Sequence, residues 1–251
     1  MVSDEPYVLT TVDGPIGWLT LNDPERLNPV TRARVAELNV AARALSDRDD
    51  VHVVVIQGAG RAFCAGADVS QGQPAADRRV PLGGGALLPG APADWTLAGM
   101  RQPVIAMIRG AAVGFGLELA LQADIRIASE DAKFVAPFAK LGIISDTGTG
   151  TWLLPRLIGW SKAAELYYTG RKVLAPEALE LGLVNDVRPE ADLLDFTRAL
   201  AEQIAENSPW SLRIMKRLIF DGLQHSRGEH LLLQNQRFNE RPARPSEEGA
   251  P

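Results

Sequence analysis

The stretch RGAAVGFGLEL (residues 109–119) decides how this chain is expected to fold. It follows VIAMI (104–108), a continuous apolar run of the kind found in strands that are buried on both faces. Gly114 and Gly116 then open a segment, residues 114–122, whose pattern predicts a helix. Small residues let a backbone approach a ligand closely, and the first N–H groups of a helix have no intrahelical acceptor. This strand–turn–helix unit is therefore a candidate binding element.

A second glycine-containing turn, FCAGAD (63–68), also follows a short β-branched run, VVVI (53–56). Two such turns that face each other would place two N–H donors around one oxygen atom, which is the geometry of an oxyanion hole. Glycines between a strand and a helix are common, so spacing alone leaves open the alternative of two ordinary structural turns.

The remaining N-terminal part of the chain alternates strands and helices that are joined by short links. Residues 8–12 and 16–21 predict a β-hairpin, and residues 125–128 predict a further strand. Residues 31–46 predict an amphipathic helix, because apolar residues recur there at spacings of three and four, and Thr31 is placed to cap it. This alternation is typical of an α/β layered core.

The pattern becomes helical after residue 189. Ser208 followed by Pro209 is a helix-start signal, and a further helix is expected near the end of this region. We therefore divide the chain into an α/β core (residues 1–189), a C-terminal helical region (190–240) and a tail (241–251) that is rich in Pro, Glu and Gly and is predicted to be disordered.

The composition excludes several classes of protein. The chain has 251 residues, of which 46% are hydrophobic and 23% are charged. These values are typical of a globular protein and not of a disordered one. A net charge of −5 gives no electrostatic footprint for nucleic acid or for an anionic membrane. Cys64 is the single cysteine, and neither a signal peptide nor a membrane-spanning run is recognised. We expect a cytoplasmic protein.

Several functional signatures are missing from the sequence. Leu119 stands where a dinucleotide-binding fingerprint needs its third glycine, and the three histidines lack the spacing of metal ligands. No metal site is therefore expected. The Gly- and Pro-rich residues 71–92 are interpreted as a surface loop, and a pocket wall is the alternative interpretation.

A series of motifs in this order resembles the enoyl-CoA hydratase/isomerase (crotonase) family, from about residue 24 to about residue 216. The motifs are FCAGAD (63–68), PVIA (103–106), GFGLELA (114–120), DIRIA (124–128), LGI (141–143), LPRLIG (154–159), TGR (169–171) and ALELGLV (178–184). The resemblance implies a spiral of ββα units with a C-terminal helical region used in trimerisation. It also implies an acyl-CoA thioester substrate, no cofactor other than the CoA within that substrate, and a homotrimer or a dimer of trimers.

The resemblance further implies roles for particular residues. The backbone N–H groups of Ala67 and Phe115 would form the oxyanion hole that holds the thioester oxygen. The CoA and substrate would touch a larger set: Arg26, Asn28, Ala65, Gly66, Asp68, Gly114 and Phe138. Cys64 is interpreted as a small core residue.

The carboxylates depart from the pattern of the family's hydratases, which use two glutamates. One glutamate aligns with Glu118, but Phe138 stands at the position of the other and cannot transfer a proton. Asp146 is a candidate substitute, because some isomerases of the family use an aspartate at the matching position. Structural alternatives stay open: Asp146 as a helix N-cap, and Glu118 as a carboxylate that complements a helix dipole.

The sequence thus favours isomerisation of an enoyl-CoA double bond by a 1,3-proton shift, which needs one shuttling carboxylate. A first alternative is hydration of an enoyl-CoA by Glu118 together with Asp146. A second is a CoA-binding protein without catalysis, suggested by Phe138 and by the absence of the helix that often follows a segment like residues 246–249 in the family.

Overall fold

The computed structural model describes residues 6–68, 96–145 and 147–240. The predictions made for residues 71–92, for Asp146 and for the tail 241–251 lie outside these described residues.

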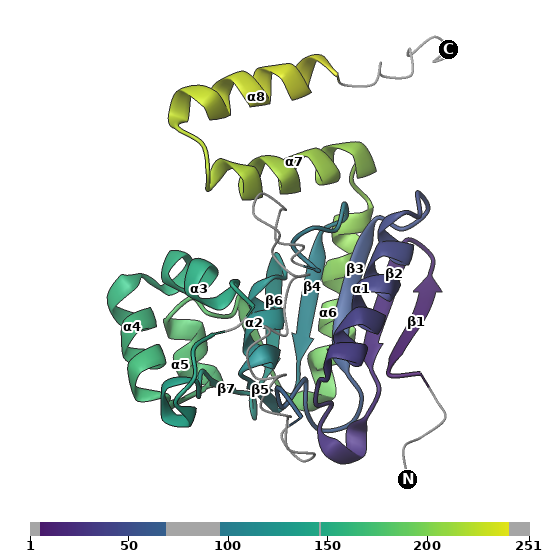
Figure 1. Ribbon diagram of the computed structural model, residues 1–251. Coiled ribbons are helices and arrows are strands. Elements are labelled where there is room, and N and C mark those ends of the chain that lie inside the picture. Colours follow the sequence, from purple (N-terminus) through teal and green to yellow (C-terminus); the bar gives the residue numbers. More distant parts are fainter. Residues whose placement is uncertain (1–5, 69–95, 146, 241–251) are drawn as a thin grey trace.

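A six-stranded sheet forms the centre of the molecule, in the order β1-β2-β3-β4-β6-β9 (Figure 1). β1 and β2 form the predicted antiparallel hairpin, and each later neighbour pairs in parallel. The central strands are buried on both faces, as their continuous apolar runs predict. The strands are β1 (Val8–Asp13), β2 (Ile16–Leu21), β3 (Val53–Gly58), β4 (Val104–Ile108), β6 (Ile125–Ser129) and β9 (Asp186–Arg188).

A second sheet of three short strands lies beside the first, in the order β5-β7-β8. β5 (Ala111–Val113) follows β4 after a corner at Gly110, where φ is +56° and a Cβ would lie 2.1 Å from the Arg61 carbonyl oxygen. β7 (Lys133–Val135) follows β6 after the short link 130–132, and β8 (Lys172–Leu174) completes the sheet. The chain therefore gives one strand to each sheet and then a helix, which is the expected ββα spiral.

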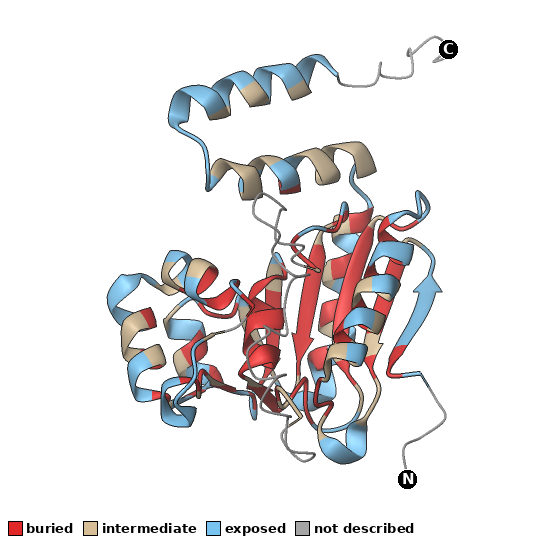
Figure 2. Ribbon diagram, in the orientation of Figure 1, coloured by how far each residue is buried: buried red, intermediate tan, exposed pale blue. Residues whose placement is uncertain are grey.

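Helices cover both faces of the large sheet. α1 (Arg32–Ser46) begins at Thr31, whose hydroxyl accepts a hydrogen bond from the Arg34 N–H as predicted. α6 (Glu190–Ala205) packs against β3, β4 and β6. The other helices of this part are α2 (Phe115–Leu121), α3 (Gly150–Ile158), α4 (Trp160–Thr169) and α5 (Ala175–Glu180), with 3₁₀ turns at Pro24–Arg26 and Ala139–Leu141. Figure 2 shows that α2 is buried along with the central strands.

The last two helices extend away from the sheets (Figure 1). α7 (Pro209–Gly222) begins at the predicted Ser208–Pro209 signal, and α8 (Arg227–Asn239) begins with a capping box at Ser226. Lys216 anchors α7 to the core: its buried ammonium group donates to the Leu97 and Gln102 carbonyls and pairs with Asp124 at 2.9 Å.

Two apolar side chains of α7 are largely exposed: Met215 is 50% exposed and Ile219 is 74% exposed. Within the described ranges, no helix is long and apolar enough to cross a membrane.

Candidate active site at the two glycine turns

The two glycine turns lie side by side in the structure. Cys64 donates its N–H to the Ala111 carbonyl at 2.9 Å, and Val113 donates to the Cys64 carbonyl at 3.0 Å. Further along, a Cβ on Gly116 would lie only 2.2 Å from that Cys64 carbonyl oxygen. The segment 63–68 and the start of α2 are thus in backbone contact, and glycine at position 116 permits it.

Within the described residues, the main-chain N–H groups of Ala67 and Phe115 donate no hydrogen bond to another backbone group. Val30 bonds to Gly66 and Asp68 at 2.8 Å each, on either side of Ala67, so the Ala67 N–H points away from Val30. Phe115 is the first residue of α2, where an N–H has no intrahelical partner. Among the residues that the structure describes, neither N–H has a hydrogen-bond acceptor.

Gly66 brings these two amides into the same neighbourhood. Its φ is +95°, and a Cβ built on it would lie 2.7 Å from the Val113 carbonyl oxygen and 3.8 Å from the Phe115 nitrogen. The peptide that follows Gly66 therefore lies against the start of α2. Two main-chain N–H groups without acceptors, on touching segments, can bind one anionic oxygen.

Glu118 lies on the first turn of α2 and is fully buried. The hydroxyl of Ser145 donates to its Oε1, and the hydroxyl of Thr147 donates to its Oε2. Thr147 is itself fixed, because its Oγ1 accepts the Thr149 N–H at 3.0 Å. Hydrogen bonds of this kind hold the carboxylate in place and favour its charged form. Asp146, between the two donors in sequence, lies outside the described residues.

An aromatic pair lies beside the Glu118 carboxylate. Phe138 is buried, and its ring centroid is 6.1 Å from that of Tyr167 on α4. A Cβ on Gly150, the first residue of α3, would lie 2.2 Å from Glu118 Oε1 and also 2.2 Å from the Tyr167 hydroxyl oxygen. Both oxygens therefore border the space that this glycine leaves empty. Phe138 was expected at the site from the resemblance, whereas sequence reasoning missed Tyr167 and Gly150.

The segments predicted to contact CoA are joined by charge and by hydrogen bonds. Arg26, with a side chain that is 42% exposed, pairs with Asp68 at 2.7 Å and so links residues 26–28 to residues 65–68. Asn28 is fully buried with φ +55°, and its amide donates to the carbonyls of Ala59, Ala62 and Phe63. The Asn28 side chain therefore holds the loop together, and its polar groups are occupied within the protein.

Cys64 is buried behind the turn, and burial raises the pKa of its thiol to about 12. A thiol that stays protonated at neutral pH is a poor nucleophile. The structure therefore supports its interpretation as a core residue.

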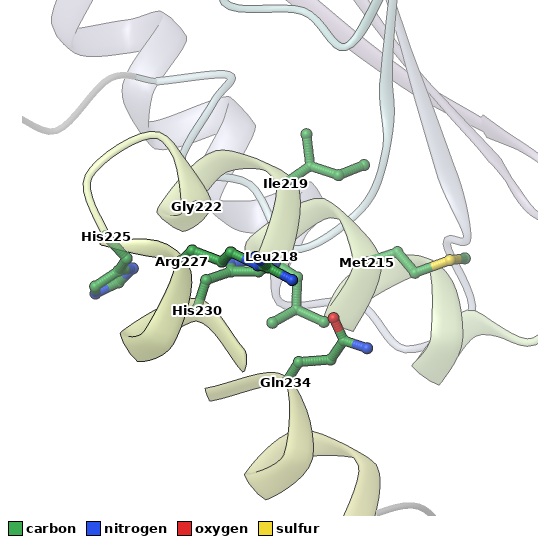
Figure 3. A pocket seen from close by; sticks show the side chains of 8 residues that line it. All are labelled: Met215, Leu218, Ile219, Gly222, His225, Arg227, His230 and Gln234. Atoms are coloured by element: carbon green, nitrogen blue, oxygen red, sulfur yellow. The ribbon is translucent and has the colours of Figure 1, made fainter. Parts of the chain in front are cut away.

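Two further observations concern the described chain outside these turns, namely its possible metal ligands and a pocket near its C-terminal helices. No group of three or more His, Cys, Asp or Glu side chains in these ranges could hold a metal ion. Figure 3 shows a surface pocket between α7 and α8. It is lined by apolar side chains and by His225, Arg227 and His230, and it lies on the helices that extend away from α2 (Figure 1).

Residues 12–250 match the family model of enoyl-CoA hydratase/isomerase. The chain belongs to this family. It is 37% identical to the 1,2-epoxyphenylacetyl-CoA isomerase of Escherichia coli over 85% of this chain and 81% of that protein. An enoyl-CoA hydratase from Bacillus anthracis is similar in structure, with a TM-score of 0.83 and 33% identity over 93% of this chain and 90% of that one. A monofunctional enoyl-CoA isomerase from M. smegmatis is also similar in structure, with a TM-score of 0.76 and 33% identity over 90% of this chain and 99% of that one.

The family and its fold are thus as the sequence motifs predict. The protein is an acyl-CoA enzyme of the enoyl-CoA hydratase/isomerase family, whose relatives include both hydratases and isomerases by name.

Proposed function

We propose that this enzyme isomerises an enoyl-CoA by a 1,3-proton shift. The observation that supports this most is that one buried carboxylate, Glu118, lies on the same helix start as the Phe115 N–H, which like that of Ala67 has no acceptor among the described residues. Phe138, at the position where the family resemblance implies a second glutamate, is a buried hydrocarbon ring. A double-bond shift needs one group that first takes a proton and then returns it. Addition of water by the usual route needs two.

The chemistry balances with the groups at this site. A carboxylate removes a proton from C2 of a 3-enoyl thioester, and the electron pair moves onto the thioester oxygen as a dienolate. The N–H groups of Ala67 and Phe115 stabilise this oxygen, and each such donor typically contributes about 10²–10³ in rate. The carboxylic acid then delivers its proton to C4, which leaves a conjugated 2-enoyl thioester and the original carboxylate. Glu118 or Asp146 is the proton carrier in this proposal.

The substrate's CoA moiety is proposed to lie along the segments bridged by Arg26 and Asp68. The small residues Ala65, Gly66 and Gly114 let its thioester end approach the two amides closely. No cofactor beyond the CoA of the substrate enters this reaction.

The exposed apolar side chains of α7 and α8 favour a homotrimer or a dimer of trimers, in which a second copy would cover them.

Hydration is the second candidate reaction, with Glu118 and Asp146 as the pair of carboxylates. One observation favours it: Ser145 and Thr147, the chain neighbours of Asp146, both bind Glu118.

The test compares Glu118→Gln and Asp146→Asn on two substrates, 3-hexenoyl-CoA and crotonyl-CoA. Isomerisation creates the ultraviolet absorbance of a conjugated enoyl thioester, whereas hydration of crotonyl-CoA removes it. We expect the proton carrier's variant to lose about 10²-fold or more in isomerisation, as general acid–base groups contribute at least that much. Glu180→Gln, on the exposed end of α5, is the matched control.

Full retention of both activities in both variants would refute the acid–base assignment. If the wild-type enzyme hydrates crotonyl-CoA but does not isomerise 3-hexenoyl-CoA, the hydratase alternative is correct. If calorimetry shows CoA binding while a broad panel of thioesters shows no turnover, the protein binds CoA without catalysis.

A further inference from the structure

The Tyr167 hydroxyl is a buried polar group that the reaction described above does not use. Its oxygen is shielded from solvent and has no hydrogen-bond partner of normal geometry within the described part of the chain. Leaving a buried donor unpaired is costly, so such groups in folded proteins usually have a function or an absent partner. The position of this hydroxyl therefore needs an explanation.

Two elements direct the hydroxyl toward the carboxylate of Glu118. Tyr167 lies on α4, and its ring stacks on Phe138, which restricts the plane of the phenol. Gly150, at the start of α3, leaves open the one space that both the phenol oxygen and Glu118 Oε1 border. A side chain at position 150 would separate the two groups. The absence of one lets them approach each other.

The phenol keeps its proton at neutral pH and is therefore available as a hydrogen-bond donor. Burial raises its pKa well above the usual range, and the negative charge of Glu118 raises it further, while the nearby Ser145 hydroxyl offsets part of this. A tyrosine that keeps its proton cannot serve as a base. It can donate that proton in a hydrogen bond to an ionised carboxylate.

We propose that Tyr167 is a positioning residue for Glu118, and that its hydroxyl donates a third hydrogen bond to this carboxylate beside those of Ser145 and Thr147. The proposal rests on the proposed function in that it takes Glu118 to be a proton carrier. The added hydrogen bond keeps the Glu118 carboxylate ionised and oriented before it removes a proton from the substrate. The ring of Phe138, which stacks on that of Tyr167, supports the phenol in this position.

The sign of the expected pH effect follows from the groups that face Glu118. Ser145 and Thr147 carry no charge, Gly150 has no side chain, and Tyr167 is the titratable group from α4; Asp146 lies outside the described residues. A hydrogen bond to the charged form lowers the pKa of a carboxyl group. Its removal therefore raises the pKa of Glu118 and shortens the pH range in which the base is ionised.

The experiment is the pH profile of kcat/KM for Tyr167→Phe, with 3-hexenoyl-CoA or, if that is not turned over, crotonyl-CoA. We expect the acidic limb to move up by about one pH unit, so that activity on that limb falls about tenfold, the factor that one pKa unit represents. KM should change less than about twofold. Tyr168→Phe is the matched control, since its side chain is 76% exposed, and its profile should overlay the wild type.

A second measurement separates this inference from the proposed function. The carboxyl carbon of Glu118 is followed by ¹³C NMR as pH is varied, with Glu118→Gln used for assignment. A higher titration midpoint in Tyr167→Phe than in Tyr168→Phe supports the hydrogen bond even if no substrate is turned over. An unchanged midpoint together with an unchanged acidic limb would overturn the inference, and a uniform loss of activity at all pH values would assign Tyr167 a purely structural role.

Discussion

Gly116→Ala tests the contact on which the proposed oxyanion site depends. The added methyl group would lie 2.2 Å from the Cys64 carbonyl oxygen and 2.8 Å from its Cβ, whereas ordinary contacts of this kind begin at 3.4 Å. The nearest atom belongs to the backbone, so no rotamer change relieves the clash. The start of α2 and the segment 63–68 must therefore part by about 1 Å.

The consequence for the reaction can be estimated from that displacement. Phe115 directly precedes Gly116 and Ala67 follows the clashing segment, so the spacing of the two N–H donors changes by a similar amount. A misplacement of about 1 Å in a catalytic arrangement can lower the rate about 10²-fold. We expect kcat for the isomerisation of 3-hexenoyl-CoA to fall by about this factor. Overpacking of this kind also typically destabilises a fold by about 1–3 kcal/mol.

The assay combines steady-state kinetics with urea unfolding of the same preparation, so that kcat is compared only between folded samples. Gly228→Ala on α8 is the control, since nothing lies within 4 Å of a Cβ there. Replacing glycine in a helix otherwise stabilises it by about 1 kcal/mol. A folded Gly116→Ala variant that is stabilised, or that keeps kcat within about threefold of the wild type, would refute the reasoning.

Three further predictions follow from single contacts. Gly150→Ala places a methyl group against Glu118 Oε1, so kcat for isomerisation should fall about as far as in Glu118→Gln while KM for the CoA thioester changes little. Burial raises the pKa of Cys64 to about 12, so iodoacetamide at pH 8 should modify it only in urea, and labelling of the folded protein at the rate of a free thiol would contradict this. Lys216→Ala leaves two buried carbonyls without their donor and should lower the free energy of unfolding by about 2 kcal/mol or more in urea titrations; an unchanged midpoint would contradict it.

The sequence predicts those elements whose pattern is complete within one segment. The helix that begins at Thr31, the hairpin of β1 and β2, and the helix start at Ser208 are all confirmed. The small sheet is different, since β5, β7 and β8 have three residues each and are stabilised by partners far away in the sequence. No local pattern of that length distinguishes a strand from a loop.

The residues of the candidate site also fall into those that a local sequence pattern reveals and those that depend on tertiary packing. The two turns are recognisable because glycines mark them, and Glu118 is singled out through the family resemblance. Tyr167 has no such mark, because its approach to Glu118 depends on how α3 and α4 pack. The buried Asn28 shows the reverse case: its amide is used by three main-chain carbonyls that no local sequence pattern could reveal.

In the proposed mechanism, main-chain N–H groups bind the thioester oxygen and side chains transfer the proton, and this separation has an evolutionary consequence. Point mutations at positions 67 and 115 to any residue other than proline keep the N–H groups, so the proposed oxyanion site tolerates drift at both. The side chains proposed to carry or position the proton, Glu118, Asp146 and Tyr167, lie at other positions and can be exchanged independently. If the proposed oxyanion site is correct, a descendant of this protein can acquire a new reaction through very few substitutions and still inherit that site intact.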